Sequence, residues 1–296
     1  MKKLSERTMA AVFAVCGCAA VFAVGAICIY MITSGLPALI KIGPQNMLAD
    51  TVWTPTAVQP RFGILNIILT SIVGTAMAIV IGVPIALLTA VFLAEVAPKN
   101  ISKAVKPAVE LLAGIPSVVY GLLGILIIKP MIYKAELMFF AGSETHKVTG
   151  GANLIAAVLV LAVMILPTVV NVSHTALLAA PNHLRSSSYA LGATKITTIF
   201  RVVIPAAKSG IITSVVLGIG RAIGEAMAIT LVAGNAVNLP LPFSSVRFLT
   251  TGIVAEMSYS QGLHRQALFT IGLVLFIFIM VINIILNTAL KSKSEK

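Results

Sequence analysis

The chain has 296 residues, of which 58% are hydrophobic and only 10% are charged, and its mean hydropathy is +1.04. Soluble proteins carry about 25% charged residues, so this composition excludes an ordinary soluble domain and indicates an integral membrane protein. The formal net charge is +12. Because the basic residues form short clusters between apolar runs, they are typical of topology signals and argue against binding of nucleic acid.

Six charge-poor runs approach or exceed the ~20 residues that a helix needs to cross a bilayer. We therefore expect an all-α fold with six transmembrane helices. The runs lie near residues 9–32, 62–94, 109–128, 152–173, 209–234 and 266–290. The first is longer than the apolar core of a signal peptide, which has about 7–15 residues, and we expect it to be retained.

The distribution of Lys and Arg predicts how the chain is oriented in the membrane. The two terminal tails and the loops at 95–108 and 174–208 together contain 13 of the 21 Lys and Arg residues. The other three loops are longer in total and contain fewer of them. By the positive-inside rule, both termini are expected to be cytoplasmic.

The segment Gly114-Ile115-Pro116-Ser117, near the start of the third run, is expected to disturb its helix. Proline lacks a backbone donor and disfavours helical conformation in the residue before it. Breaks at membrane depth are tolerated where they line a cavity or are covered by protein. A gate or pivot and a simple kink are both compatible with this pattern.

The loop between the fourth and fifth runs predicts two short helices around a glycine turn. The first runs from His183 to Leu191 and ends at Gly192, since glycine takes the left-handed conformation without steric cost. Thr194 can cap the second helix, which closes at Pro205. Such a compact knob suits the groove of a partner, and a surface loop resting on lipid headgroups is the alternative.

Arg221 and Glu225 are the only charged residues between Ser209 and Ser245. An ionised group at membrane depth costs at least ~2.5–3.5 kcal/mol, so such residues usually face a bundle interior or a pathway. A spacing of four predicts one helix face, on which they pair with each other or with a neighbouring helix. We interpret them as lining a route through the membrane, and a structural ion pair that fixes helix register is the alternative.

The sequence contains no Gly-x-x-x-x-Gly-Lys-[Ser/Thr] phosphate loop, and its four histidines show no metal-ligand spacing. We therefore expect this chain to bind no cofactor or metal, and any coupling to ATP must come from a partner ATPase. Cys16, Cys18 and Cys28 all lie in the first apolar run, where a packing role is expected rather than disulfides.

The spacing Gly192…Val202-x-Ile204-Pro205 resembles the second half of the EAA loop of binding-protein-dependent ABC importer permeases. The resemblance implies that this loop docks on an ATPase subunit. The residues that it assigns to coupling are Arg185, Ser186, Tyr189, Gly192, Lys195 and Pro205. Ser186 stands where the family has a glutamate, and Arg185 and Lys195 are expected to supply charge contacts that this serine cannot.

Two further segments resemble phosphate importer permeases of the PstC type. They are residues 110–124, which include the break at 114–117, and residues 220–228 with the continuation Val232-Ala-Gly-Asn235. The resemblance implies a MetI-like permease core at 62–290, preceded by a helix and loop at 1–61 and followed by a cytoplasmic tail at 291–296. It also implies a non-enzymatic subunit of an ATP-driven phosphate importer in the cell membrane of a bacterium or archaeon.

By the same resemblance, the partners are a paralogous PstA-like permease, PstB-like ATPase subunits and an extracytoplasmic PstS-like phosphate-binding protein. Arg221 is then expected to bind phosphate through two parallel hydrogen bonds. Glu225 is expected to hold Arg221 in place or to lower its affinity for the anion. Three alternatives stay open. They are a permease for another oxyanion such as molybdate or sulfate, a passive channel, and a membrane enzyme that acts on a lipid phosphate.

Overall fold

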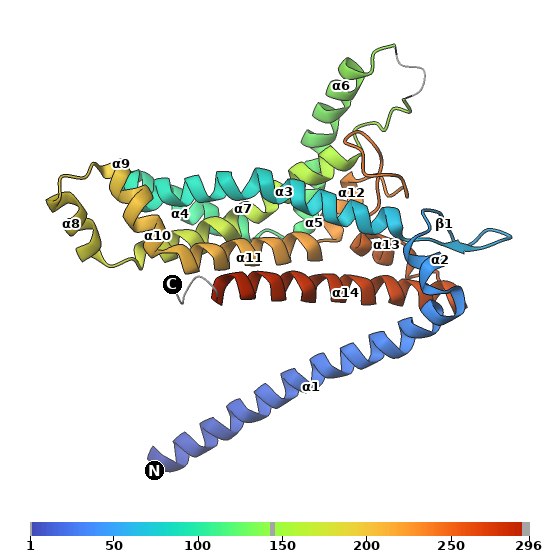
Figure 1. Ribbon diagram of the computed structural model, residues 1–296, viewed down its shortest axis with the longest axis horizontal. Helices are drawn as coiled ribbons and strands as arrows, with labels where there is room; N and C mark the ends of the chain where they lie inside the picture. The colour runs from blue at the N-terminus through green and yellow to red at the C-terminus, as the bar shows by residue number, and fades with distance from the viewer. Residues whose placement is uncertain (1, 143–145, 292–296) are drawn as a thin grey trace.

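The computed structural model describes residues 2–142 and 146–291 (Figure 1). Its α-helices are α1 (Lys2–Ile42), α2 (Pro44–Leu48), α3 (Leu65–Val91), α4 (Lys99–Gly114), α5 (Ser117–Leu123), α6 (Lys129–Phe139), α7 (Leu154–Leu178), α8 (Asn182–Ala190), α9 (Lys195–Thr198), α10 (Ile204–Ala206), α11 (Lys208–Gly224), α12 (Met227–Val232), α13 (Leu249–Glu256) and α14 (Gly262–Lys291). π-Helical turns lie at Phe92–Val96, Gly124–Ile128 and Ile199–Val203. Strands β1 (Trp53–Thr54) and β2 (Arg61–Phe62) form a short antiparallel hairpin. The all-α prediction is confirmed.

Helix α7 forms the centre of the molecule. Its sequence is almost wholly apolar, and Asn153 caps its first turn by accepting a hydrogen bond from the Ala156 amide at 3.1 Å. Helices α3 and α11 pack along it. A Cβ atom added at Gly218 of α11 would lie 2.7 Å from the Val169 side chain, so glycine permits this close approach.

Helix α1 packs on α14 through its C-terminal part and diverges from the rest of the molecule toward its N-terminus (Figure 1). At the crossing, the Thr270 hydroxyl donates to the Gly35 carbonyl at 2.7 Å, and a Cβ atom at Gly35 would lie 2.9 Å from the Phe269 backbone. The diverging part exposes large apolar side chains such as Phe13 and Phe22. Such a surface is suited to lipid or to another membrane helix.

Helices long and apolar enough to cross a membrane agree in number with the six predicted spans when a bent pair is included. Within residues 2–142 and 146–291, five are single segments, at Thr8–Ile42, Leu65–Val96, Ser117–Phe139, Leu154–Leu178 and Gly262–Ile285. The sixth joins Lys195–Ala206 to Lys208–Gly224, which meet at 71°.

Two predicted spans were placed wrongly along the chain. The third, predicted over 109–128, lies at Ser117–Phe139, because Pro116 separates it from α4. Helix α4 is amphipathic, and its residues are all exposed or half-buried. The fifth, predicted as one helix over 209–234, is divided, since Glu225 adopts an extended conformation between α11 and α12.

The two ends of the molecule differ in character. One end carries α8, α9 and α10, and the opposite end carries α2, the β1–β2 hairpin and α13 (Figure 1). The N-terminal end of α1 and the C-terminal end of α14 both point toward the end with α8 (Figure 1). Residues 292–296 of the predicted tail at 291–296 lie outside the described residues.

Candidate translocation pathway and coupling loop

Arg221 lies in the last turn of α11 and is half-buried. Its Nη1 donates a hydrogen bond to the Thr168 hydroxyl of α7 at 3.3 Å. Its helix neighbours Gly220 and Gly224 are exposed, and a Cβ atom at either would meet nothing within 4 Å. Together with exposed Leu217, these residues share one helix face, which the described residues leave uncovered. Arg221 therefore lies beside a surface open to a further subunit.

Glu225 does not pair with Arg221: among the ion pairs of the described residues, none joins the two. The predicted shared helix face is wrong, because α11 ends one residue before Glu225. The Glu225 carboxylate instead accepts a hydrogen bond from the Ala228 amide at 2.8 Å, which caps the start of α12. Its carbonyl accepts one from the Thr250 hydroxyl at 2.6 Å. Glu225 thus stabilises the interruption of the span.

The predicted break at Gly114, Pro116 and Ser117 is a full interruption of the helix rather than a kink within it. Helix α4 ends at Gly114, two extended residues follow, and α5 begins at Ser117. The Tyr120 hydroxyl donates to the Leu112 carbonyl at 2.7 Å and so bridges the interruption. A cavity of about 600 Å³ lies beside it. The arrangement suits a pivot between α4 and α5.

The helix–turn–helix predicted for the loop between the fourth and fifth spans is confirmed. Helix α8 is followed by Gly192 with φ of 80°, the left-handed conformation that glycine adopts freely. Thr194 then caps α9 by accepting a hydrogen bond from the Thr197 amide at 3.3 Å. Pro205 is exposed in α10, just before the bend into α11. We call residues 182–206 the knob.

Arg185 is held inside the chain, contrary to the expected contact with a partner. Its Nη2 lies 2.6 Å from the Glu95 carboxylate and 2.9 Å from the Leu177 carbonyl. Ser186, Tyr189 and Lys195 remain exposed on the knob. Exposed apolar side chains accompany them, namely Leu191, Ile196 and Phe200. The knob thus offers two exposed cations, Lys195 and Arg201, and an apolar surface, which suit a protein partner.

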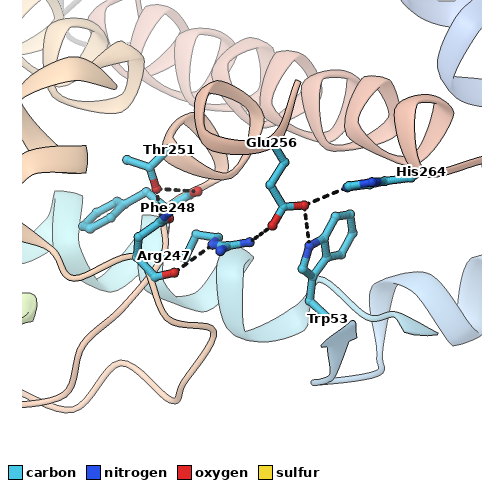
Figure 2. Close-up of polar contacts among 7 residues, drawn as sticks. Trp53, Arg247, Phe248, Thr251, Glu256 and His264 are labelled. Carbon is cyan, nitrogen blue, oxygen red and sulfur yellow. Dashed lines mark hydrogen bonds and ion pairs between the residues drawn. The ribbon is translucent and has the colours of Figure 1, made fainter. Parts of the chain in front are cut away.

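A further polar cluster, which the sequence did not reveal, lies at the opposite end of the molecule. Figure 2 shows Trp53, Arg247 and His264 converging on the carboxylate of Glu256. Trp53 Nε1 lies 2.9 Å and His264 Nε2 2.7 Å from Glu256 Oε2, and Arg247 Nη1 is paired with Oε1. Arg247 Nε also donates to the Asn235 carbonyl at 3.1 Å. The carboxylate therefore joins the hairpin, the loop before α13, α13 itself and α14.

Burial raises the pKa of the Glu256 carboxyl, but hydrogen bonds from Trp53 and His264 and the charge of Arg247 outweigh that effect. The net result is a pKa below the ordinary value of 4.5. Glu256 is therefore ionised at neutral pH, and the cluster is an internally compensated network of charges and donors.

Residues 82–294 match the protein family described as binding-protein-dependent transport system inner membrane component. The chain belongs to this family. It is therefore a membrane-embedded permease subunit of an ABC transport system, which works with a substrate-binding protein and an ATPase, and it is not an enzyme.

The permease is similar to known bacterial proteins over most of its length. It is 39% identical over 267 residues to the probable ABC transporter permease protein YqgH of Bacillus subtilis (strain 168), covering 87% of this chain and 83% of that protein. It is 34% identical over 255 residues to the phosphate transport system permease protein PstC of Haemophilus influenzae, covering 81% of this chain and 79% of that protein.

A solved structure of the MetNI methionine ABC transporter in an inward-facing conformation matches the permease with a TM-score of 0.52 at 19% identity. The match covers 78% of this chain and 94% of that chain. At this identity the likeness concerns the fold alone, and it confirms the predicted MetI-like architecture.

Proposed function

We propose that this permease is the membrane-spanning subunit of an ATP-driven importer of inorganic phosphate. The observation that carries the proposal is Arg221, a cation in the last turn of α11 beside a helix face open to a further subunit. A planar guanidinium can bind phosphate oxygens through two parallel hydrogen bonds and stays charged at any working pH. Similarity to PstC proteins supports phosphate as the anion.

The open face of α11 is proposed to receive a paralogous, PstA-like permease, so that the two subunits enclose the pathway. PstB-like ATPase subunits are proposed to bind the knob and to supply all ATP binding, and a PstS-like phosphate-binding protein is proposed to dock at the end with the β1–β2 hairpin. In this orientation the knob and both termini face the cytoplasm of a bacterium or archaeon. We take the MetI-like permease core to extend over residues 62–290.

The knob is built to pass a movement on to Arg221. Its α8 is tied by the Arg185–Glu95 ion pair to the π-helical turn that extends α3. Its α10 continues through the bend into α11, whose last turn carries Arg221. A displacement of the knob by an ATPase therefore moves two core helices together. This is the mechanical basis that we assign to alternating access.

The direct test is uptake of radiolabelled phosphate by the complex reconstituted in liposomes, with ATP hydrolysis measured in parallel. We expect phosphate uptake to require ATP. We also expect that unlabelled sulfate and molybdate do not compete with radiolabelled phosphate for uptake. Competition by either anion at the same concentration as phosphate would favour another oxyanion as the cargo. Uptake that proceeds without ATP would indicate a passive channel.

A further inference from the structure

A cavity of about 520 Å³ opens at the end of the molecule opposite the knob. It is lined by residues 51–57 of the hairpin, by residues 235–237, and by Arg247, Glu256 and Tyr259. Arg247 is the one Lys, Arg or His among these lining residues. The cavity is separate from the Arg221 region, and the predicted pathway residues do not line it.

Arg247 can offer a hydrogen bond to a ligand in this cavity. Its Nε and Nη1 are used by the Asn235 carbonyl and the Glu256 carboxylate, whereas Nη2 has no hydrogen bond to any described residue. Glu256 also accepts from Trp53 and His264. An anion can therefore accept a hydrogen bond from Arg247 without leaving the Glu256 carboxylate unpaired. An unpaired buried carboxylate would be strongly unfavourable.

Asn235 also lines this cavity. Its side-chain Oδ1 is buried and has no hydrogen-bond partner among the described residues. An unpaired buried acceptor is unfavourable by about 1–3 kcal/mol. We therefore expect Oδ1 to accept a hydrogen bond from a ligand when the cavity is occupied. Asn235 also has a φ of 59°, the left-handed conformation that asparagine adopts more readily than most other non-glycine residues.

We infer that this cavity is an outer entry site for a protonated tetrahedral oxyanion, with hydrogen phosphate as the ligand that fits. The oxyanion's oxygens accept from Arg247, and its own hydroxyl donates to Asn235. Sulfate carries no proton at neutral pH and leaves the Asn235 acceptor unpaired. The inference rests on the proposed function, because it places the site before Arg221 on the same inward route.

Two short connections join the entry site to the interrupted span. Asn235 follows α12, whose start is capped by Glu225. Arg247 precedes α13, whose Thr250 hydroxyl donates to the Glu225 carbonyl at 2.6 Å. Binding of a ligand in the outer cavity can therefore change the backbone position at the end of α11, which is close in the chain to Arg221.

Trp53 makes this inference directly testable, since it is the only tryptophan in the chain and lines the cavity. An anion that draws Arg247 toward itself changes the charge around Glu256, to which Trp53 donates. We would titrate the full-length chain in lipid nanodiscs with inorganic phosphate at pH 7, at constant ionic strength, and follow tryptophan fluorescence. A saturable change is expected for phosphate, and binding at least about tenfold weaker for sulfate.

Asn235→Asp is the deciding variant, because it preserves shape and tolerates positive φ but puts a negative charge against the anion. It should weaken phosphate binding by at least about tenfold, since like charges in a low-dielectric site repel. Arg61→Gln is the matched control: Arg61 pairs with Asp50 at 2.7 Å on the same end of the molecule and lines a different cavity. Its titration should equal that of the wild type.

Equal responses to phosphate and sulfate, or an unchanged titration in Asn235→Asp, would overturn the entry site. A flat Trp53 titration together with normal phosphate uptake by the complex would also overturn it and would leave the proposed function standing. Saturable, phosphate-selective binding in a complex that does not take up phosphate supports the site and contradicts the proposed function.

Discussion

Arg185 and Glu95 form a 2.6 Å ion pair although 90 residues separate them in the chain. Arg185 also donates to the carbonyls of Leu177 and Ala180 at 2.9 and 2.7 Å, at the end of α7. One guanidinium therefore ties the knob to two core helices. The contact explains why an arginine in the knob is not available to a partner.

Glu95→Gln should weaken this coupling, because a neutral amide replaces the charged partner of Arg185. Removing one member of a partly buried pair leaves a charge with poorer compensation, a loss of about 1–3 kcal/mol. We expect phosphate uptake per ATP hydrolysed to fall, while the ATPase still copurifies. Glu110→Gln is the control, since its pair with Lys106 is exposed at 3.9 Å. Unchanged stoichiometry in Glu95→Gln would contradict the mechanical role of the pair.

Arg221→Lys keeps the positive charge and removes the planar guanidinium group. If Arg221 binds phosphate through two parallel hydrogen bonds, uptake should fall at least about tenfold while insertion and assembly stay normal. The hydrogen bond from Arg221 to Thr168 allows a control variant that changes a structural contact of Arg221 but not Arg221 itself. Thr168→Val removes that contact alone and should reduce uptake less. Near-normal uptake by the lysine variant would refute bidentate binding.

Glu225→Gln should be mild, because glutamine retains an oxygen that can accept from the Ala228 amide. Glu225→Ala removes the cap of α12 and should destabilise the assembled complex by about 1 kcal/mol. Thermal stability of the two purified complexes, measured side by side, separates them. A glutamine variant as unstable as the alanine variant would show that the negative charge itself is required.

The sequence was most informative where local chemistry decides structure. Gly192 and Thr194 specify the turn and cap of the knob without help from distant residues. Contacts between distant segments left no such signal: Glu95 with Arg185, and Trp53 with Glu256, are unrelated by spacing. The four-residue spacing of Arg221 and Glu225 was misleading, because it predicts a shared face only if the helix continues.

Glu256 predicts a pH dependence of the outer end of the molecule. Its pKa is lowered in the folded protein, so the stabilisation is present above the ordinary value of 4.5 and is lost as pH falls through the folded value. Trp53 fluorescence should therefore change on acidification below about pH 4.5 as the carboxylate is protonated. Glu256→Gln should abolish this transition. A transition that persists in the glutamine variant would assign it to another group.

Gly192→Val tests the knob as the coupling element. Nothing lies within 4 Å of the Cβ position at Gly192, so steric crowding by neighbours is excluded and the backbone alone is affected. A β-branched residue at a φ of 80° is strained by about 1–3 kcal/mol, which should distort the turn between α8 and α9. We expect the variant to insert normally and to lose its ATPase subunit, or to hold it without ATP-dependent uptake.

Gly192→Asn is the matched control for that variant, because asparagine tolerates the left-handed conformation better than other non-glycine residues. It should retain the ATPase and most of the uptake, which separates backbone strain from the mere addition of a side chain. The measurement is copurification of the ATPase together with phosphate uptake in liposomes. If Gly192→Val binds the ATPase and transports like the asparagine variant, the ATPase must act on the permease through a surface other than the knob.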